Sequence, residues 1–538
     1  MKSALILGAA ALLASTAVSS APPRRAKEPA KPAAKADATP RKQYFHPSEV
    51  RSTGSVTVGG QPIAYDAVAG TIVVHAKDWS DTDVLDADTE DKDKNQPKPE
   101  ASMFYTAYFK QGVPSASRPI TFLFNGGPGS STVWLRMGAF GPVRVVTADG
   151  RHTAAPYSLV NNEQSLLDAS DLVFIDAPGT GFSRIAGKDK EKAFYGVDQD
   201  IDAFSQFIFQ FLSQYGRWSS PKYVFGESYG TMRGAGLALA LQNKDIDLNG
   251  LILLSDILNW DFVPDDPQVN PGIDMPYIVT LPTYAATAWY HSKVGNRPQL
   301  HPFLAEVEAF ATGDYATALL KGNDLPSDER QRIAERLSGY TGLPVSYLLK
   351  TNLRIEYGAF QKELLAGQEA TTGTLDTRFV GATIDPLAKV ASYDPQSAAI
   401  SAAYLAAWNG YVRSALHYGA GVEYKSGIPI YSKWDYKHAP PGVSDPLIAL
   451  PNVLPDLAVA MKQNPDMKVM VNGGYYDVST PYFEGIMEMR HLPVPPALRG
   501  NIEYKYYESG HMVYAHLPSL VALHDSVADF IRRTSGAR

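Results

Sequence analysis

Short apolar runs bounded by glycine, proline and polar residues recur along the chain, and longer amphipathic stretches separate them. A short run predicts a buried strand, whereas apolar positions spaced three or four apart predict a helix. The strand-like runs are residues 103–109, 120–124, 172–175, 223–225, 250–254, 467–471 and 504–507, and helical spacing occurs at 201–215, 231–241 and 520–533. Strands that alternate with helices predict a mostly parallel sheet.

Glycine-bearing loops follow directly on the runs at 120–124, 172–175 and 223–225. Loops that follow parallel strands meet at the carboxyl edge of the sheet, where sites are usually built. We therefore expect these loops to lie close together. Residues 54–75 differ, because their short apolar segments are separated by glycine-rich turns, which predicts β-hairpins.

Helical patterns dominate from residue 282 to about residue 431, which predicts an inserted helical cap. Its clearest helices are 284–291, 303–310, 327–337 and 398–417. The predicted organisation is a signal peptide at 1–21, a disordered Pro/Ala/Lys-rich linker at 22–45, the first part of the α/β core at 46–260, the cap at 261–430 and the second part of the core at 431–538.

The N-terminus carries the features of a secretory signal. Met1 and Lys2 give a positive start, residues 4–17 are apolar, and small residues at 19–21 suit cleavage. No later stretch is apolar for long enough to span a bilayer. The signal therefore predicts an exported protein, secreted or in a periplasm. With no cysteine in the chain there can be no disulfide, which fits a bacterial periplasm better than a eukaryotic secretory route.

The composition restricts the kinds of partner. A net charge of −7 and the lack of interleaved basic and aromatic residues argue against nucleic acid. Residues 81–100 are crowded with Asp and Lys but lack the ligand spacing of a calcium loop, so we expect a mobile surface loop there.

Candidate chemistry centres on residues 222–230. An apolar strand breaks at Gly226, Ser228 follows between two glycines, and a helix rich in Ala and Leu begins at Thr231. Strand, sharp turn and helix around Gly-x-Ser-x-Gly are typical of a nucleophile elbow, which lifts a serine hydroxyl clear of the sheet. The alternative is an ordinary glycine-rich turn between a strand and a helix.

A serine nucleophile needs a base and a group that orients the base. Asp477 and His511 each follow a predicted strand, on the same sheet edge as Ser228. An oxyanion also needs N–H donors. Tyr229, directly after the serine, offers one, and the glycine-rich loop at 125–129 offers another.

These motifs together resemble the serine carboxypeptidase family of the α/β-hydrolase fold. The matching stretches are Asn-Gly-Gly-Pro-Gly-Ser-Ser at 125–131, Pro-Tyr-Ser at 156–158, Ile-Asp-Ala-Pro-Gly-Thr-Gly-Phe-Ser at 175–183, Gly-Glu-Ser-Tyr-Gly at 226–230, the Asp477 loop ending at Pro481, and Gly-His-Met-Val at 510–513. The resemblance implies a mostly parallel central sheet with an inserted helical cap, and neither a metal nor an organic cofactor.

The resemblance implies a role for each candidate site residue. Those implied are Ser228 as nucleophile, His511 as base and Asp477 as its orienter, Gly127 and Tyr229 as oxyanion donors, Asn125, Gly126 and Glu227 as binders of the substrate's terminal carboxylate, and Met512 as a residue of the leaving-group pocket. A carboxyl group that binds a carboxylate must be protonated, so the pKa of Glu227 should be raised and activity should favour acidic pH.

Two positions depart from the family pattern. Ser130 stands where the family usually has cysteine, which removes a covalent link and leaves the chemistry intact. Ala139 stands where the family often has a second glutamate. Without that neighbour, we expect the pKa of Glu227 to lie nearer to that of an ordinary carboxyl than in a two-glutamate site.

The sequence therefore predicts a serine-type carboxypeptidase that releases C-terminal residues from peptides through an acyl-enzyme. Two alternatives stay open. The same triad could serve an esterase, an acyltransferase or an aminopeptidase. A non-catalytic binding protein on a hydrolase scaffold is the other alternative, and the intact Ser, Asp, His set argues against it.

Overall fold

The computed structural model describes most of the chain beyond the N-terminal segment, namely residues 43–77, 79, 98–264, 267–296, 298–443 and 450–536. The predicted signal peptide, nearly all of the predicted linker and most of the Asp- and Lys-rich loop at 81–100 lie outside these residues. Residues 43–538 form one compact unit.

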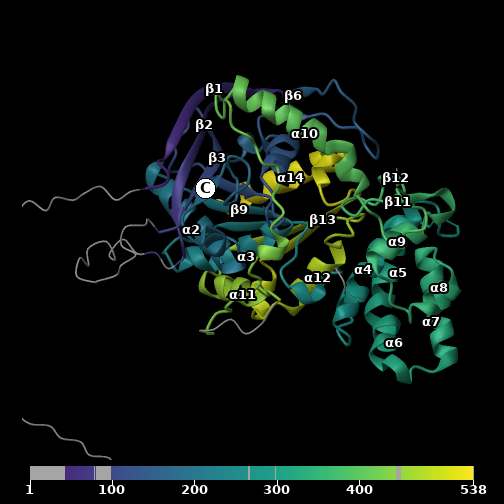
Figure 1. Ribbon diagram of the computed structural model, residues 1–538. Coiled ribbons are helices and arrows are strands. Elements are labelled where there is room, and N and C mark those ends of the chain that lie inside the picture. The colour runs from purple at the N-terminus through teal and green to yellow at the C-terminus, as the bar shows by residue number, and fades with distance from the viewer. Residues whose placement is uncertain are drawn as a thin grey trace, which may run out of the picture. The chain divides into compact units, whose positions relative to one another are not determined.

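A ten-stranded sheet forms the centre of this unit, in the order β1-β2-β3-β7-β4-β9-β10-β13-β14, with β8 paired to β3 (Figure 1). The strands are β1 Ser48–Val58, β2 Gln61–His75, β3 Glu100–Lys110, β4 Ile120–Phe124, β7 Asp171–Ile175, β8 Arg184–Ala186, β9 Lys222–Glu227, β10 Gly250–Leu254, β13 Lys468–Gly474 and β14 Ile502–Tyr507. Two small sheets pair β5 Val143–Val145 with β6 Leu159–Asn161, and β11 Ala370–Thr372 with β12 Val380–Ala382.

In the sheet, neighbouring strands pair in parallel along the series β7, β4, β9, β10, β13 and β14. The strands β1, β2, β3 and β8 are antiparallel to their neighbours. The predicted mostly parallel sheet is thus confirmed. The loops after β7, β4, β9, β13 and β14 all leave the same carboxyl edge, so residues far apart in the sequence meet there.

The prediction of several hairpins over residues 54–75 is wrong in one respect. Residues 61–75 form a single strand, β2, which pairs with β1 over residues 61–71, and the only turn in the region is at Gly59 and Gly60. Gly70 lies inside β2, where an added Cβ would be 2.6 Å from the Ser48 carbonyl oxygen. It permits close strand approach where the sequence suggested a turn.

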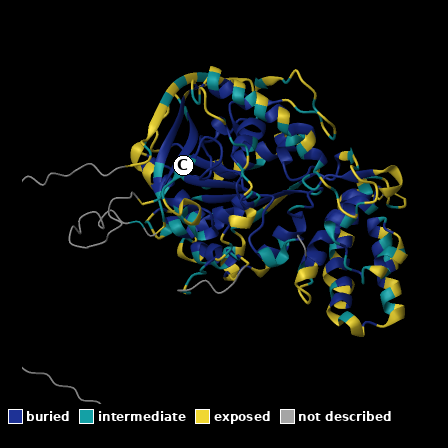
Figure 2. Ribbon diagram, viewed as in Figure 1, coloured by how far each residue is buried: buried dark blue, intermediate teal, exposed yellow. Residues whose placement is uncertain are grey.

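Alternate residues of each strand enter the hydrophobic layers on opposite faces, as the two-residue period of a strand requires. On one face, Val224 and Leu251 pack with α2 Val197–Gln214, α3 Tyr229–Gln242 and α11 Leu454–Gln463. On the other, Phe225 and Ile252 pack with α10 Pro395–Ser414 and α14 Leu517–Thr534. Figure 2 shows the strands between these helices as buried.

Most helices between residues 275 and 363 build a third hydrophobic cluster, which also takes in Tyr482 and Phe483 of α12 Tyr482–His491. They are α4 Met275–Tyr290, α5 Leu300–Phe310, α6 Ala316–Lys321, α7 Ser327–Thr341, α8 Val345–Lys350 and α9 Tyr357–Glu363; the short helices α1 Lys190–Phe194 and α13 Pro496–Arg499 lie elsewhere. Helix α10 packs on the sheet instead and lies beside β6 in Figure 1, away from α5 to α8. The predicted insertion therefore contains two kinds of segment. Helices α4 to α9 pack with one another and with α12, whereas α10 packs on the sheet.

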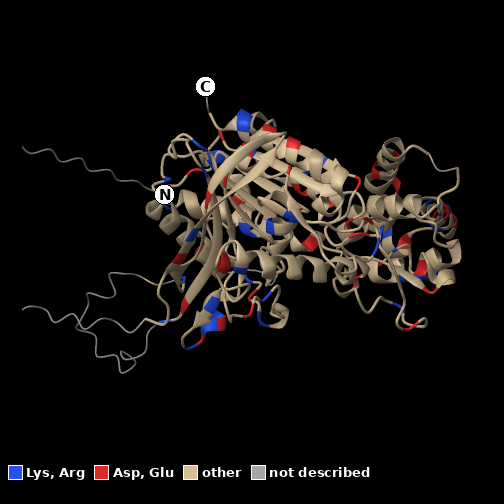
Figure 3. Ribbon diagram, turned by 90° about the horizontal axis from the view of Figure 1, so that it is seen from above, with Lys and Arg blue, Asp and Glu red and all other residues tan. Residues whose placement is uncertain are grey.

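Lys, Arg, Asp and Glu are interspersed over the ribbon in Figure 3. Within the described ranges, no helix is long and apolar enough to cross a membrane.

Candidate active site

Ser228 occupies the apex of the turn between β9 and α3, with φ 60° and ψ −135°. This left-handed backbone is rare for a residue with a side chain and is typical of a nucleophile elbow. The turn is so tight that a Cβ added at Gly226 would lie 2.1 Å from the Gly230 carbonyl oxygen. Residues 222–230 are otherwise buried, and Ser228 is half-buried. The fold therefore presents this hydroxyl outward.

Asp477 and His511 follow β13 and β14, the strands that come after β9 and β10 in the sheet. His511 Nδ1 lies 2.7 Å from Asp477 Oδ2, and both side chains are buried. Burial alone would lower the pKa of His511, but the charge and hydrogen bond of Asp477 raise it above its ordinary value. The structure thus brings together the predicted base and its predicted orienter.

The Asp477 carboxylate is held by its own loop as well. Its Oδ1 accepts hydrogen bonds from the backbone N–H groups of Ser479 at 2.9 Å and Thr480 at 3.1 Å. The Thr480 hydroxyl lies 2.7 Å from Asp477 Oδ2 and 3.1 Å from His511 Nδ1. Sequence reasoning did not single out Thr480, although it lies inside the quoted loop that ends at Pro481.

β10 lies between β9 and β13 in the sheet, and the end of β10 contacts both the elbow and the His511 loop. Ser228 N donates to the Leu254 carbonyl at 3.0 Å, and the hydroxyl of Ser255 donates to the His511 carbonyl at 2.8 Å. In the described part of the chain no hydrogen bond joins Ser228 Oγ to the His511 ring. The catalytic assignment of these residues is therefore a proposal, supported by their common position on the sheet edge.

The two predicted oxyanion segments lie against each other. A Cβ added at Gly126 would lie 2.4 Å from the Tyr229 backbone nitrogen. Gly127, the next residue, has φ 111°, which favours glycine. The backbone of the glycine-rich loop therefore lies close to the backbone nitrogen of Tyr229 in the elbow.

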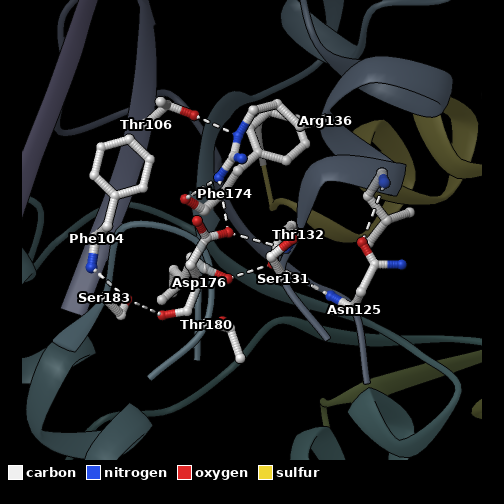
Figure 4. Close-up of polar contacts among 12 residues, drawn as sticks. Phe104, Thr106, Asn125, Ser131, Thr132, Arg136, Phe174, Asp176, Thr180 and Ser183 are labelled. Carbon is white, nitrogen blue, oxygen red and sulfur yellow. Dashed lines mark hydrogen bonds and ion pairs between the residues drawn. The ribbon is translucent and has the colours of Figure 1, made fainter. Parts of the chain in front are cut away.

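A buried ion pair supports this glycine-rich loop (Figure 4). Asp176 Oδ1 accepts from the Thr132 backbone N–H at 2.9 Å and pairs with Arg136 at 3.2 Å. The Thr132 hydroxyl also donates to the Ile175 carbonyl. Asp176 and Thr132 thereby tie the loop after β7 to the loop after β4.

Asn125, at the start of the loop, is fixed at two points. Its Oδ1 accepts from the Leu135 N–H at 3.1 Å, and its carbonyl accepts from Arg233 at 2.9 Å. Because the oxygen is engaged, the Nδ2 group is left to donate. Its hydrogen bonding to the neighbouring Glu227 favours the ionised carboxylate.

Glu227, the residue before the serine, is buried with 2% of its surface exposed. The Tyr514 hydroxyl donates to its two carboxyl oxygens at 3.1 and 2.9 Å. Burial raises the pKa of Glu227 to about 7, although the charge of His511 and the hydrogen bonds from Tyr514 and Asn125 oppose the rise. Burial thus raises the pKa of Glu227 without the second carboxyl group, in whose place the chain has Ala139.

Met512 is also buried and packs in the same hydrophobic cluster as Tyr514. Tyr514 was not singled out from the sequence, and its only sequence signal is its place three residues after His511.

A segment of the insertion bonds to the loops of both Asp477 and His511, a contact that no pattern in the sequence predicted. Three backbone hydrogen bonds join residues 374–377 to the loops: His511 N to Leu375 O at 2.6 Å, Thr377 N to Tyr476 O at 2.9 Å and Val478 N to Thr374 O at 3.2 Å. We call residues 373–379 the strap. Asp394 holds it by accepting from the N–H groups of Thr374 and Leu375 at 2.6 and 3.2 Å.

Residues 94–257 match the family model of serine carboxypeptidases. The chain is 36% identical over 103 residues to the pheromone-processing carboxypeptidase KEX1 of Saccharomyces cerevisiae, a match that covers 19% of this chain and 13% of that protein. It is 26% identical over 178 residues to serine carboxypeptidase-like 36 of Arabidopsis thaliana, covering 31% and 34%.

Among solved structures, a proline iminopeptidase of Mycobacterium smegmatis is similar at 13% identity and a TM-score of 0.31, over 90% of this chain and 99% of that one. An open-form lipase is similar at 14% identity and a TM-score of 0.32, over 81% and 96%.

The family match spans the glycine-rich loop after β4, the loop after β7 and the elbow, and the sheet has the parallel order that brings Asp477 and His511 to the same edge. Residues 94–257 are therefore similar to the serine carboxypeptidase family, and the mostly parallel sheet with its elbow is an α/β-hydrolase fold.

Proposed function

We propose that the protein is a serine-type carboxypeptidase, which hydrolyses the last peptide bond of a peptide through an acyl-enzyme at Ser228. The observation that carries this proposal is Glu227. A buried carboxyl group with a pKa of about 7 lies directly before the nucleophile and beside the Asn125 amide. An ordinary esterase does not need a carboxyl group at this position. In a carboxypeptidase, the protonated carboxyl can donate a hydrogen bond to the terminal carboxylate of the substrate.

The reaction would follow the usual order for a serine hydrolase. His511 removes the Ser228 proton as the oxygen attacks the last peptide carbonyl, and the N–H groups of Gly127 and Tyr229 stabilise the oxyanion. His511 then returns the proton to the leaving nitrogen, which frees the C-terminal amino acid. Water, activated by the same histidine, attacks the acyl-enzyme and releases the shortened peptide.

Recognition of the free carboxylate would depend on pH. Below pH 7 the Glu227 carboxyl is mostly protonated and donates, together with Asn125 Nδ2, to the substrate. Above pH 7 it ionises and repels the substrate, so KM should rise. The raised pKa of His511 sets the acid limb, because the base must be neutral to accept the serine proton.

The test compares blocked dipeptides with their C-terminal amides between pH 4.5 and 8.5. We expect free acids to be preferred at low pH and to lose this preference as KM rises through about pH 7. Equal cleavage of acids and amides at every pH would favour the esterase, acyltransferase or aminopeptidase alternative. No hydrolysis and no labelling of Ser228 by a fluorophosphonate would favour a binding protein.

We also propose that the protein is exported, secreted or in a bacterial periplasm, on the basis of the charged start and apolar stretch of residues 1–21. Intact-mass measurement of the exported protein should show loss of about the first twenty residues. Recovery of that material with Met1 intact would contradict the proposal.

A further inference from the structure

The Tyr514 hydroxyl lies in direct hydrogen-bond contact with the carboxyl group that the proposed function needs. Tyr514 belongs to the short helix η10 Val513–Ala515, directly after the His511 loop. It donates to Glu227 Oε1 at 3.1 Å and Oε2 at 2.9 Å, and 3% of its surface is exposed. Water therefore does not compete for this hydrogen bond.

Two tyrosine side chains lie against the residue before Ala139, the position at which the family resemblance would place a second glutamate. Ala139 lies in the helical segment η2 Leu135–Phe140 and is fully buried. A Cβ added at its neighbour Gly138 would lie 2.4 Å from the Tyr404 hydroxyl oxygen and 2.7 Å from Cδ2 of Tyr514. Two phenol side chains, from α10 and η10, thus pack against the segment that carries Ala139.

We propose that the Tyr514 hydroxyl takes the place of the second glutamate and holds the Glu227 carboxyl in the orientation that meets the terminal carboxylate of the peptide. This inference rests on the proposed function and makes Tyr514 a positioning residue. A phenol has one proton to donate. One oxygen of Glu227 accepts it, which leaves the other oxygen to carry the proton that the substrate accepts.

A phenol in place of a second carboxyl group changes the electrostatics of the site, because the two groups shift the pKa of Glu227 in opposite directions. A second carboxyl nearby disfavours the ionised form, whereas a donated hydrogen bond favours it. Burial, followed by the charge of Glu227, raises the pKa of Tyr514 well above its ordinary value, so the phenol keeps its proton throughout. The Glu227 carboxyl is thus oriented by a phenol that stays protonated over the pH range in which the carboxyl titrates.

The other titratable groups that act on Glu227 come from separate elements. They are His511 and Asp477, from the loops after β14 and β13; Glu227 and Arg144 of β5 act in turn on Tyr404 of α10. Tyr404 is a useful comparison, since it lies beside the same segment and no hydrogen bond joins its hydroxyl to Glu227 among the described residues.

The test is Tyr514→Phe, with Tyr404→Phe as the matched control, assayed on free-acid and amidated dipeptides. Below pH 6, Tyr514→Phe should raise KM for free acids about three- to tenfold, because the carboxyl is no longer held. Its alkaline limb should move up by about one pH unit, because a donor to the ionised form is gone. The two profiles should therefore cross, while Tyr404→Phe follows the wild type.

The outcomes separate the two ideas. If the wild-type enzyme does not discriminate acids from amides, the proposed function fails before Tyr514 is at issue. If it does discriminate but Tyr514→Phe and Tyr404→Phe behave alike, the role of Tyr514 is overturned. A parallel rise in KM at all pH values, without a shifted limb, would also overturn it, because that is the effect of a merely structural residue.

A measurement on otherwise wild-type protein covers the case in which Tyr514→Phe does not fold. Tyrosine labelled with ¹³C at the hydroxyl-bearing ring carbon should give one buried resonance that titrates with a midpoint near 7, the pKa of Glu227. In Glu227→Gln that titration should vanish. Persistence of every tyrosine titration in Glu227→Gln would contradict the contact.

Discussion

Ser228 and Glu227 are adjacent in the chain but lie in opposite surroundings. Ser228 adopts φ 60° in the turn and is half-buried, whereas Glu227 ends β9 and is 2% exposed. The strained turn separates the two side chains, so the Ser228 hydroxyl is partly exposed while the Glu227 carboxyl is buried and has a pKa of about 7. One tight turn therefore places the proposed nucleophile next to a buried acid.

At the residue scale, Ser228→Ala and His511→Ala should each lower kcat by about 10⁴-fold or more while the fold is kept. A fluorophosphonate should label wild-type Ser228 and leave Ser228→Ala unlabelled. Ser130→Ala, which changes another half-buried serine of the site region, should be labelled normally. Full labelling of Ser228→Ala would contradict the assignment of Ser228 as the nucleophile.

Glu227→Gln should make KM for free-acid peptides nearly independent of pH between 6 and 8, since an amide donates without titrating. In the wild type KM should rise over this range, because burial raises the pKa of Glu227 to about 7 and the carboxyl therefore loses its proton between pH 6 and 8. KM measured over this range is the check. An alkaline rise in KM that persists in Glu227→Gln would show that another group titrates.

At the scale of elements, the catalytic loops depend on segments that lie outside the parallel sheet. The strap bonds to the loops of Asp477 and His511, and farther along the insertion Ile428 N donates to the Gly129 carbonyl at 2.9 Å. The inserted region therefore touches the loops of Asp477 and His511 and the glycine-rich loop after β4. We infer that it helps to position these three loops.

Gly510→Ala tests the contact between the strap and the His511 loop. An added Cβ would lie 2.4 Å from both Asp376 Cβ and Leu375 O, so the strap must shift. We expect a loss of about 1–3 kcal/mol in the free energy of unfolding. We also expect kcat/KM to fall by about tenfold or more, because His511 moves with the loop.

The matched control is Gly500→Ala, because nothing lies within 4 Å of a Cβ added at Gly500. It should leave both the free energy of unfolding and kcat/KM close to the wild-type values. Equal effects of the two substitutions, in thermal unfolding and in steady-state kinetics, would show that the strap contact does not matter.

At the scale of the whole molecule, His438 joins parts of the core that are far apart in the chain. Its ring nitrogens lie 2.7 Å from Asp198 of α2 and 2.9 Å from Asp456 of α11, and it is 6% exposed. Burial alone would lower the pKa of His438, but the hydrogen bonds and charges of the two carboxylates raise it to about 9. The protonated histidine thus connects two helices that cover the same face of the sheet.

Because the folded pKa lies above that of an unfolded histidine, this link stabilises the fold fully below about pH 6.5 and is lost as pH rises through 9. His438→Gln should lower the free energy of unfolding by about 1–3 kcal/mol at pH 6 and by much less at pH 9.5. Denaturant unfolding at both pH values is the measurement. His301→Gln, at a histidine whose side chain is 64% exposed, should change little at either pH, and equal losses for both variants would refute the link.

The sequence alone determined the features that depend on local periodicity and local turns. The strands at 120–124 and 250–254 agree with β4 and β10 at both ends, and the Ser228 elbow forms where its glycines predict it. The Ser, Asp, His order followed from where each residue stands after a strand. Short-range patterns are enough here because a buried parallel strand has to be a continuous apolar run.

Tertiary structure decided the features that depend on contacts between distant residues. The continuation of β2 through Gly70, the packing of α10 on the sheet and the strap on the catalytic loops each need a partner far away in the chain. The contact of Tyr514 with Glu227 spans 287 residues. The pKa of Glu227 belongs to this second group, because burial by the assembled fold raises it and no motif in the sequence records how deeply a side chain will be buried.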